Sequence, residues 1–236
     1  MVRAALGQNV EKTPVWLFRQ AGRHLPEYRE YKDTVGRNFL EMLQHPEDVA
    51  ECTLQPLRRY PLDAAILFSD ILVIPQAVGM SVTMPGGVGI QVPHPVTTPE
   101  DLTNYDLSTD KAMANLSHVL ESVSLIKSKM GEEGFGATPL IGFSAAPFTL
   151  LFYMVGGSSK KNPTAGVDFL KKYPDEGKKL LKDLTDIVLE YLVAQVERGA
   201  DIIQVFEAMG MMIAEEDFLE YELGCLEYLG TELRKR

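Results

Sequence analysis

The 236-residue sequence predicts an α/β protein built around a parallel sheet. Four short apolar runs, of the kind found in buried strands, alternate with segments that have the pattern of helices. A polar or charged residue follows each run within a few positions. The carboxyl ends of parallel strands share one edge of the sheet, and ligand-binding residues collect at that edge. We therefore expect a site there.

The first predicted strand is Val15–Phe18, which runs into a loop that carries Arg19, Gly22 and Arg23. Arginine keeps its charge at all relevant pH values and presents a planar fork of donors, which suits carboxylate or phosphate groups. The loop therefore predicts an anionic small-molecule ligand. The alternative is that both arginines pair with structural Asp or Glu residues, and their spacing does not decide between the two.

The second strand–helix unit begins with a predicted helix over Pro46–Tyr60, which opens with proline and two acidic residues. The continuous apolar run Asp63–Phe68 then predicts the second strand, and Asp70 follows it directly. Asp70 thus takes the position after the second strand that the arginine loop takes after the first. The Gly- and Pro-rich segment Met80–Pro95 predicts a β-hairpin, and Ser108–Met130 has the apolar spacing of one amphipathic helix.

Two more units complete the predicted sheet. Pro139–Ser144 is the third strand, and Pro147 suits the start of a helix that bears Tyr153. A long helix over Pro174–Arg198 leads to the fourth strand, Asp201–Phe206. A last helix begins at Glu215, and residues at helical steps along it are Phe218, Tyr221 or Glu222, Cys225 and Leu229.

Composition excludes several classes of function. Hydrophobic residues make up 45% of the chain, yet no run is long enough to cross a membrane. The net charge of −10 argues against nucleic-acid binding. Lys and Arg slightly outnumber Asp and Glu in the first 60 residues, so the basic end is the arginine-loop end. The N-terminus lacks the features of a secretory signal, and Cys52 and Cys225 are expected to be reduced thiols.

Several motifs, in this order, resemble the uroporphyrinogen decarboxylase family. They are Pro14–Tyr28 with its Arg-Gln-Ala-Gly-Arg core, Leu54–Ala65, Phe68–Gln76 with Phe-Ser-Asp-Ile-Leu, and Gly142–Met154. The resemblance implies a TIM-type (β/α)8 barrel that acts as a homodimer without metal or organic cofactor. It implies a carboxy-lyase of haem and chlorophyll biosynthesis, which removes the four acetate carboxylates of uroporphyrinogen III and gives coproporphyrinogen III.

The resemblance also assigns roles to single residues. Asp70 would accept hydrogen bonds from pyrrole N–H groups and stabilise a cationic intermediate, while Arg19 and Arg23 would hold substrate carboxylates. Tyr153 would donate a hydrogen bond near the reacting arm. The full expected substrate-binding set is Arg19, Arg23, Phe68, Asp70, Tyr153, Phe206 and Ala208.

Two departures from the family pattern stand out. Ala208 occupies a position where the family often has serine, so a binding hydroxyl is replaced by backbone groups alone. The later strands of the barrel and a C-terminal Gly-His-Gly loop have no counterpart. We therefore expect residues 1–236 to be a C-terminally incomplete domain, about the N-terminal half of the barrel with four β/α units, and poorly active or associating by itself.

Two other functions stay open. A corrinoid-linked methyltransferase of the same superfamily would use zinc held by His and Cys, and this sequence has no such cluster. A non-catalytic half-barrel would bind porphyrinogen or pair with a full-length subunit. The expected location is cytoplasmic, with the plastid as the alternative.

Overall fold

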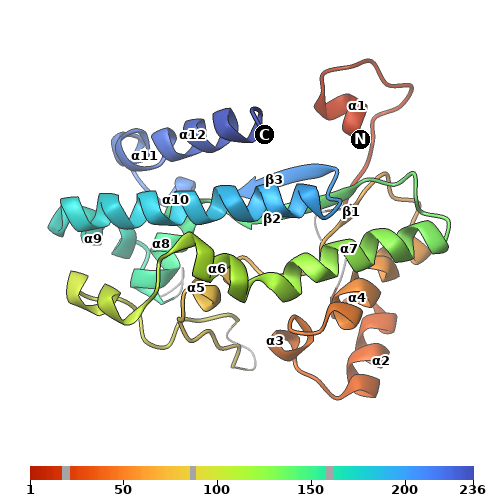
Figure 1. The fold of residues 1–236 in the computed structure, drawn as a ribbon, viewed down its shortest axis with the longest axis horizontal. Helices are drawn as coiled ribbons and strands as arrows, with labels where there is room; N and C mark the ends of the chain where they lie inside the picture. Colours follow the sequence, from red (N-terminus) through yellow and green to blue (C-terminus); the bar gives the residue numbers. More distant parts are fainter. Residues whose placement is uncertain (18–21, 86–88, 158–161) are drawn as a thin grey trace. The chain divides into compact units, whose positions relative to one another are not determined.

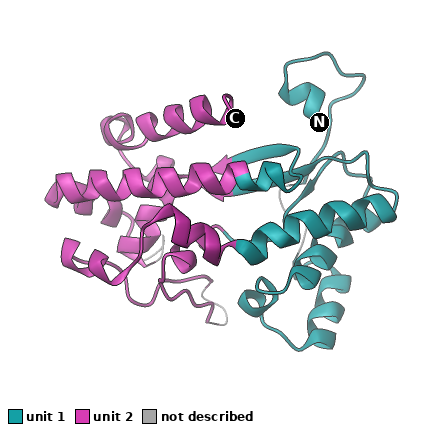
Figure 2. Ribbon diagram, viewed as in Figure 1, with its two compact units in different colours: residues 1–70, 117–143, 194–204 teal, residues 71–116, 144–193, 205–236 magenta. Residues whose placement is uncertain are grey.

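The computed structural model describes residues 1–17, 22–85, 89–157 and 162–236 (Figure 1). The chain forms two compact units (Figure 2). The first unit consists of residues 1–70, 117–143 and 194–204, and the second of 71–116, 144–193 and 205–236.

The first unit combines four N-terminal helices with the start of a parallel sheet. Its elements are α1 (Val2–Ala5), α2 (Pro26–Val35), α3 (Phe39–Met42), α4 (Pro46–Arg59), β1 (Ala65–Ile66) and α7 (Ser117–Glu132), with parts of β2 (Leu140–Ala145), α10 (Pro174–Glu197) and β3 (Ile202–Phe206). The strand order is β1-β2-β3. Strand β1 runs parallel to β2, with Ala65 opposite Leu140. The predicted parallel α/β architecture is therefore confirmed.

The prediction of a strand at the N-terminus is wrong for the residues that the structure describes. Residues 15–17 are extended but form no strand. The Val15 N–H donates a hydrogen bond to the Asp63 carboxylate at 2.8 Å, and the Asp63 N–H donates one to the Val15 carbonyl at 2.9 Å. Val15 and Leu17 nevertheless stay 50% and 42% exposed. An apolar run becomes a buried strand only where other elements cover it, and the described residues leave this face open.

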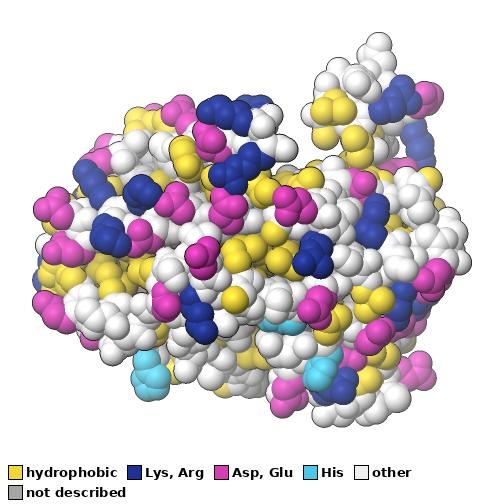
Figure 3. All heavy atoms as spheres, viewed as in Figure 1, with side chains coloured by type: hydrophobic (Ala, Val, Ile, Leu, Met, Phe, Trp, Pro, Cys, Tyr) yellow, Lys and Arg dark blue, Asp and Glu magenta, His cyan; other side chains and the backbone are white. Residues whose placement is uncertain are grey.

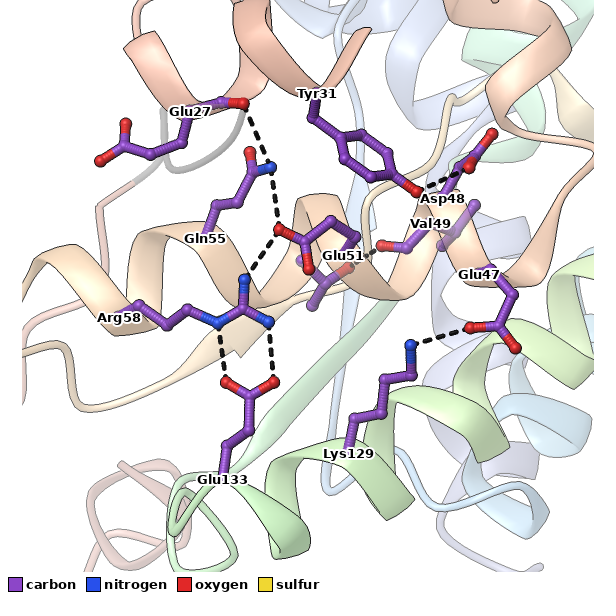
Figure 4. Close-up of polar contacts among 11 residues, drawn as sticks. Glu27, Tyr31, Glu47, Asp48, Val49, Glu51, Gln55, Arg58, Lys129 and Glu133 are labelled. Carbon is purple, nitrogen blue, oxygen red and sulfur yellow. Dashed lines mark hydrogen bonds and ion pairs between the residues drawn. The ribbon is translucent and has the colours of Figure 1, made fainter. Parts of the chain in front are cut away.

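Helix α4 forms where it was predicted, from Pro46 to Arg59, and packs along α7. Figure 4 shows the ion pairs that accompany this packing. Arg58 donates to both carboxylate oxygens of Glu133 at 2.7 Å and to Glu51 at 2.7 Å. These two acids raise the pKa of the Arg58 guanidinium. Lys129 of α7 pairs with Glu47 at 2.8 Å.

A buried glutamine links the end of α10 to the centre of the sheet. The Gln195 side-chain oxygen accepts the Phe143 N–H at 2.9 Å, and its NH₂ group donates to the Phe143 carbonyl at 3.0 Å. Gly142 leaves the necessary space, because a Cβ at this position would lie 2.5 Å from the Gln195 oxygen. Strand β2 is buried along its whole length, so these backbone groups need protein partners.

The second unit is mostly helical. Its elements are α5 (Val73–Ala77), η1 (Pro99–Asn104), α6 (Thr109–Asn115), α8 (Pro147–Gly156), α9 (Ala165–Lys172), most of α10, η2 (Gly210–Met212), α11 (Glu215–Tyr221) and α12 (Leu223–Leu233). Helix α8 begins at Pro147 as predicted. It packs closely on α9, since a Cβ on Gly166 would lie 2.5 Å from the Phe152 ring.

Two segments that were each predicted as one helix are pairs of helices. Ser108–Met130 divides into α6 and α7, with Leu116 between them. The segment after Glu215 divides into α11 and α12 at Glu222, which has φ −106° and ψ −39°. Each interruption is a single residue, so the spacing of apolar residues continues across it and gives no sign of the break.

The second predicted strand is shorter than expected, at two residues, whereas two further predictions agree with the structure. The hairpin in Met80–Pro95 is confirmed by an antiparallel bridge between Thr83 and Gln91. Both cysteines are free, with Cys52 buried in α4 and Cys225 half-buried in α12. Burial raises the pKa of both thiols, and at Cys52 the neighbouring Glu51 and Asp48 raise it further.

Candidate active site

Arg23 lies in a tight turn that precedes α2. The turn closes through a hydrogen bond from the Leu25 N–H to the Gly22 carbonyl at 3.0 Å, and Gly22 has a φ of +112° that favours glycine. Leu25 is buried, whereas Arg23 is exposed and forms no ion pair with a described residue. Of the two alternatives for this loop, structural pairing is therefore not seen for Arg23. Arg19 lies outside the described residues.

Asp70 lies in the loop that leaves β1. Pairing with β2 continues to Leu67, whose N–H donates to the Ile141 carbonyl at 3.0 Å. The next N–H, that of Phe68, donates to the Thr53 hydroxyl of α4 at 3.0 Å. This places Asp70, which is half-buried, after the carboxyl end of the strand, as predicted.

Phe68 connects this loop to the region of Arg23. Its ring packs on Tyr28 of α2, with centroids 5.8 Å apart, and edge-on against Phe39 at 5.5 Å. Only 8% of Phe68 is exposed. Phe68 is thus mainly a core residue that holds the Asp70 loop beside α2, the helix that follows the Arg23 turn. The first unit therefore brings the predicted cation and the predicted carboxylate to neighbouring segments.

The second unit brings together the other predicted site residues. The Ala208 N–H donates to the hydroxyl of Thr149 at 2.9 Å. Thr149 and Tyr153 are four residues apart on α8, so their side chains lie on the same face of that helix. The Ala146 N–H donates to the Phe206 carbonyl at 2.9 Å. Phe206 and Ala208 thus lie where β3 ends and α8 begins, whereas Tyr153 lies further along α8 on the face that carries Thr149. Both Tyr153 and Phe206 are half-buried.

The second unit also holds two neighbouring carboxyl groups, of which Glu207 was predicted from its place after the fourth strand and Glu222 was missed at the level of sequence. Glu207 follows β3 directly, and its Oε1 accepts the N–H groups of Met209 and Gly210. Glu222 is fully buried, and its Oε2 accepts the Phe148 N–H at 3.1 Å. Burial and the nearby Glu207 carboxylate raise the pKa of Glu222 to about 9. One signal was present in the sequence, because Glu222 is at helical spacing from Phe218, Cys225 and Leu229.

The chemistry available to these groups is that of binding and electrostatics. The exposed Arg23 guanidinium and the half-buried Asp70 carboxylate suit a ligand that carries negatively charged groups and develops a positive charge elsewhere during its reaction. Within the described ranges, no three His, Cys, Asp or Glu side chains are grouped so that they could hold a metal ion. None of the described helices has the length and apolar character needed to span a bilayer. On the face shown in Figure 3, basic side chains lie among acidic ones.

The fold and the positions of these side chains define an α/β protein of TIM-barrel-like type, with polar residues after the carboxyl ends of its strands. A solved methyltransferase from Methanosarcina mazei has the same fold, with a TM-score of 0.76 and 23% identity over 98% of this chain and 65% of that one. The chain belongs to the uroporphyrinogen decarboxylase (URO-D) family, whose model matches residues 1–236.

Curated members of the family are similar along the whole chain. Uroporphyrinogen decarboxylase of Danio rerio is 42% identical over 100% of this chain and 62% of its own length. The Drosophila virilis protein is 43% identical over 97% of this chain and 56% of its own length, and the Schizosaccharomyces pombe protein 42% over 100% and 64%. The family resemblance of the motifs is thereby confirmed. The chain spans less than two thirds of these relatives.

Proposed function

We propose that this chain acts in the decarboxylation of the four acetate side chains of uroporphyrinogen III, which gives coproporphyrinogen III. The observation that carries the proposal is the placement of Arg23 and Asp70 in a chain of the URO-D family. Arg23 is exposed and forms no ion pair with a described residue. Asp70 lies in the loop that Phe68 holds beside α2, the helix that follows the Arg23 turn. Such a pair suits a substrate that is anionic at its rim and becomes cationic at its centre.

The arginines would bind the substrate through its carboxylates. A guanidinium donates two parallel hydrogen bonds to one carboxylate, which fixes both position and orientation. Arg23 has the exposure needed for this contact, and we assign the same role to Arg19. Arginine is a poor acid, with a pKa of roughly 12.5 or more. Orientation of carboxylates is therefore its proposed role, ahead of proton donation.

Asp70 would supply the negative charge for the reaction. Protonation of a pyrrole carbon makes the ring a cationic electron sink. The bond between the acetate methylene and its carboxylate then breaks, carbon dioxide leaves, and the electron pair enters the ring. Protonation of the methylene carbon gives the methyl group, and loss of the ring proton restores the pyrrole. A carboxylate that accepts the pyrrole N–H bonds stabilises the cation, most strongly where water is excluded.

The second unit would contribute Tyr153, Phe206 and Ala208 to substrate binding. The Tyr153 hydroxyl would donate a hydrogen bond near the reacting arm. Because the Ala208 N–H is donated to Thr149, its carbonyl is the polar group that this residue can offer in place of a serine hydroxyl. Phe206 would supply ring surface, and the nearly buried Phe68 would contact substrate only along one edge.

We further propose that the chain corresponds to about half of a (β/α)8 barrel, as one URO-D domain that works as a homodimer in its complete form. Every residue of β3 is at least partly exposed, which fits a sheet that continues with further strands. The expected cofactor requirement is none, and the expected location is cytoplasmic. The relatives contain additional sequence, and we expect it to supply the rest of the cleft.

The partly exposed residues of β3 also suit a second candidate function, a non-catalytic half-barrel that binds porphyrinogen or pairs with a full-length subunit. The methyltransferase alternative has support from fold alone, through the Methanosarcina mazei likeness at 23% identity. A zinc assay on purified protein would test it.

The decisive experiment is anaerobic incubation of the purified chain with uroporphyrinogen, followed by oxidation and chromatography of the porphyrins. Asp70→Asn should keep the fold and lower turnover by roughly a hundredfold or more, the size typical of losing one preorganised electrostatic contact. Asp110→Asn, an exposed change on α6, is the matched control. Near-normal turnover in Asp70→Asn would contradict the proposed role of Asp70. Substrate binding without turnover in the unaltered chain would favour the non-catalytic alternative.

A further inference from the structure

The turn that follows β3 is organised by one carboxylate. Glu207 accepts two hydrogen bonds from this turn through Oε1, one from the Met209 N–H and one from the Gly210 N–H, the latter at 2.8 Å. Its second oxygen, Oε2, is buried and receives no hydrogen bond from an N–H group of a described residue. The turn thus depends on a side chain that has only half of its acceptor capacity filled by the backbone.

The second carboxyl group comes from the junction of α11 and α12. Glu222 is 0% exposed, and its Oε2 accepts the N–H of Phe148 in the first turn of α8 at 3.1 Å. Its Oε1 is buried and, like Glu207 Oε2, receives no backbone N–H from the described residues. Glu222 therefore links the α11–α12 junction to the start of α8 through Oε2, and its Oε1 takes no part in this contact.

The two remaining oxygens are buried and have no hydrogen-bond partner among the described residues. Glu207 lies near enough to Glu222 for its charge to act on it, and a proton held between the two carboxyl groups would give both oxygens a partner. Two ionised carboxylates in one dry site repel each other, and one proton removes the repulsion. Burial and the charge of Glu207 raise the pKa of Glu222 to about 9, opposed only by the Phe148 N–H.

The surroundings of the pair contain no compensating cation among the described residues that interact with Glu222. Helix α12 contributes Cys225, whose thiol pKa is raised by burial and by the charge of Glu222. Helix α10 contributes the Thr185 hydroxyl, which contacts Cys225, and α8 contributes a backbone N–H alone. A proton held between the two carboxyls would neutralise one of the two charges where these described groups supply no cation.

We propose that Glu207 and Glu222 share one proton and form a pH-sensitive clasp, which holds the turn after β3 against the start of α8 and the α11–α12 junction. The clasp is closed while the proton is present and opens when both groups are ionised. The turn carries Ala208 between Phe206 and Met209, so opening would release the segment that we assign to substrate binding. That last consequence rests on the proposed function, but the clasp itself does not.

The expected pH dependence follows from proton linkage. Glu222 has an ordinary value of 4.5 in the unfolded chain and about 9 in the folded one. A raised pKa means that the folded state holds the proton more tightly. The resulting stabilisation is complete below about pH 4.5 and is lost as pH rises towards 9. One proton changes the ratio of folded to unfolded protein by at most about tenfold per pH unit.

The test compares the unaltered chain with Glu222→Gln in urea unfolding between pH 5 and 9. The amide copies the protonated carboxyl, because its oxygen accepts the Phe148 N–H and its NH₂ donates to Glu207. We expect Glu222→Gln to remove most of the decline with pH and to be the more stable protein near pH 9. Glu227→Gln, an exposed change on α12, should follow the unaltered chain. Parallel pH curves for the unaltered chain and Glu222→Gln would overturn the clasp.

A second measurement needs no variant and no activity. Carbon-13 NMR of the glutamate carboxyl carbons in the unaltered chain should show one residue with a titration midpoint well above neutrality. Hydrogen exchange at Met209, Gly210 and Phe148 should quicken over the same pH range. If every glutamate titrates near its ordinary value, the shared proton does not exist. Because neither readout involves uroporphyrinogen, failure of the clasp is distinguishable from failure of the proposed function.

Discussion

Removal of the Gln195 side chain tests the packing that positions the centre of the sheet. Its amide makes two hydrogen bonds to the backbone of Phe143, at 2.9 Å and 3.0 Å, in a region without solvent access. Each buried backbone group that loses a partner costs about 1–3 kcal/mol. Gln195→Ala should therefore lower the free energy of unfolding by about 2–6 kcal/mol. A typical domain has only about 5–15 kcal/mol in total.

The measurement is urea unfolding followed by circular dichroism, together with hydrogen exchange at the Phe143 amide. Gln44→Ala, at an exposed position after α3, controls for the loss of a glutamine as such and should change little. Gly142→Ala perturbs the same contact from the opposite side, since its Cβ would meet the Gln195 oxygen at 2.5 Å. We expect a cost of about 1–3 kcal/mol from overpacking, and less than additive effects in the double variant.

The reasoning fails if Gln195→Ala changes the free energy of unfolding by less than about 1 kcal/mol, the net value of an ordinary hydrogen bond. It also fails if the Phe143 amide keeps its full protection from exchange in the variant. Either result would mean that water or another group replaces the glutamine amide without cost. The link between α10 and β2 would then be incidental to the stability of the first unit.

Two further changes probe the candidate site. Arg23→Lys should raise the Michaelis constant for uroporphyrinogen with little change in melting temperature, because lysine keeps the charge and loses the fork. A large decrease in melting temperature with an unchanged Michaelis constant would instead indicate that Arg23 has a structural role. Thr53→Val should cost about 1–3 kcal/mol, since the buried Phe68 N–H loses its acceptor at 3.0 Å. Urea unfolding measures that loss, and Thr34→Val on the exposed side of α2 is its control.

Sequence alone was sufficient where local pattern and burial agree. The apolar run that became β2 is buried at every position, and Pro147 marks the start of α8 because its fixed backbone angle suits the first helical turn. Val15–Phe18 has an equally apolar pattern, yet residues 15–17 form no strand. A pattern states what a segment can bury, but neighbouring elements decide whether it is buried.

The candidate site divides in the same way. Asp70, Tyr153 and Glu207 were predicted from their places after strands, a rule that depends on chain order alone. Glu222 was not, because its partners are far away in sequence. It contacts Phe148 across 74 positions, and no local rule specifies that contact. Its only sequence signal, an acid on an apolar helical face, is ambiguous until the partner is known.

The two free cysteines give the chain one built-in reporter in each compact unit. Cys52 belongs to the first unit and Cys225 to the second. Alkylation requires the thiolate and access of the reagent, and both thiols have raised pKa values. The rate of modification of the buried Cys52 therefore measures how often the first unit opens. At the half-buried Cys225, the increase in rate over that of the folded protein reports opening of the second unit. Without any engineered label, mass spectrometry of the two alkylated peptides would show whether the units unfold together or one at a time.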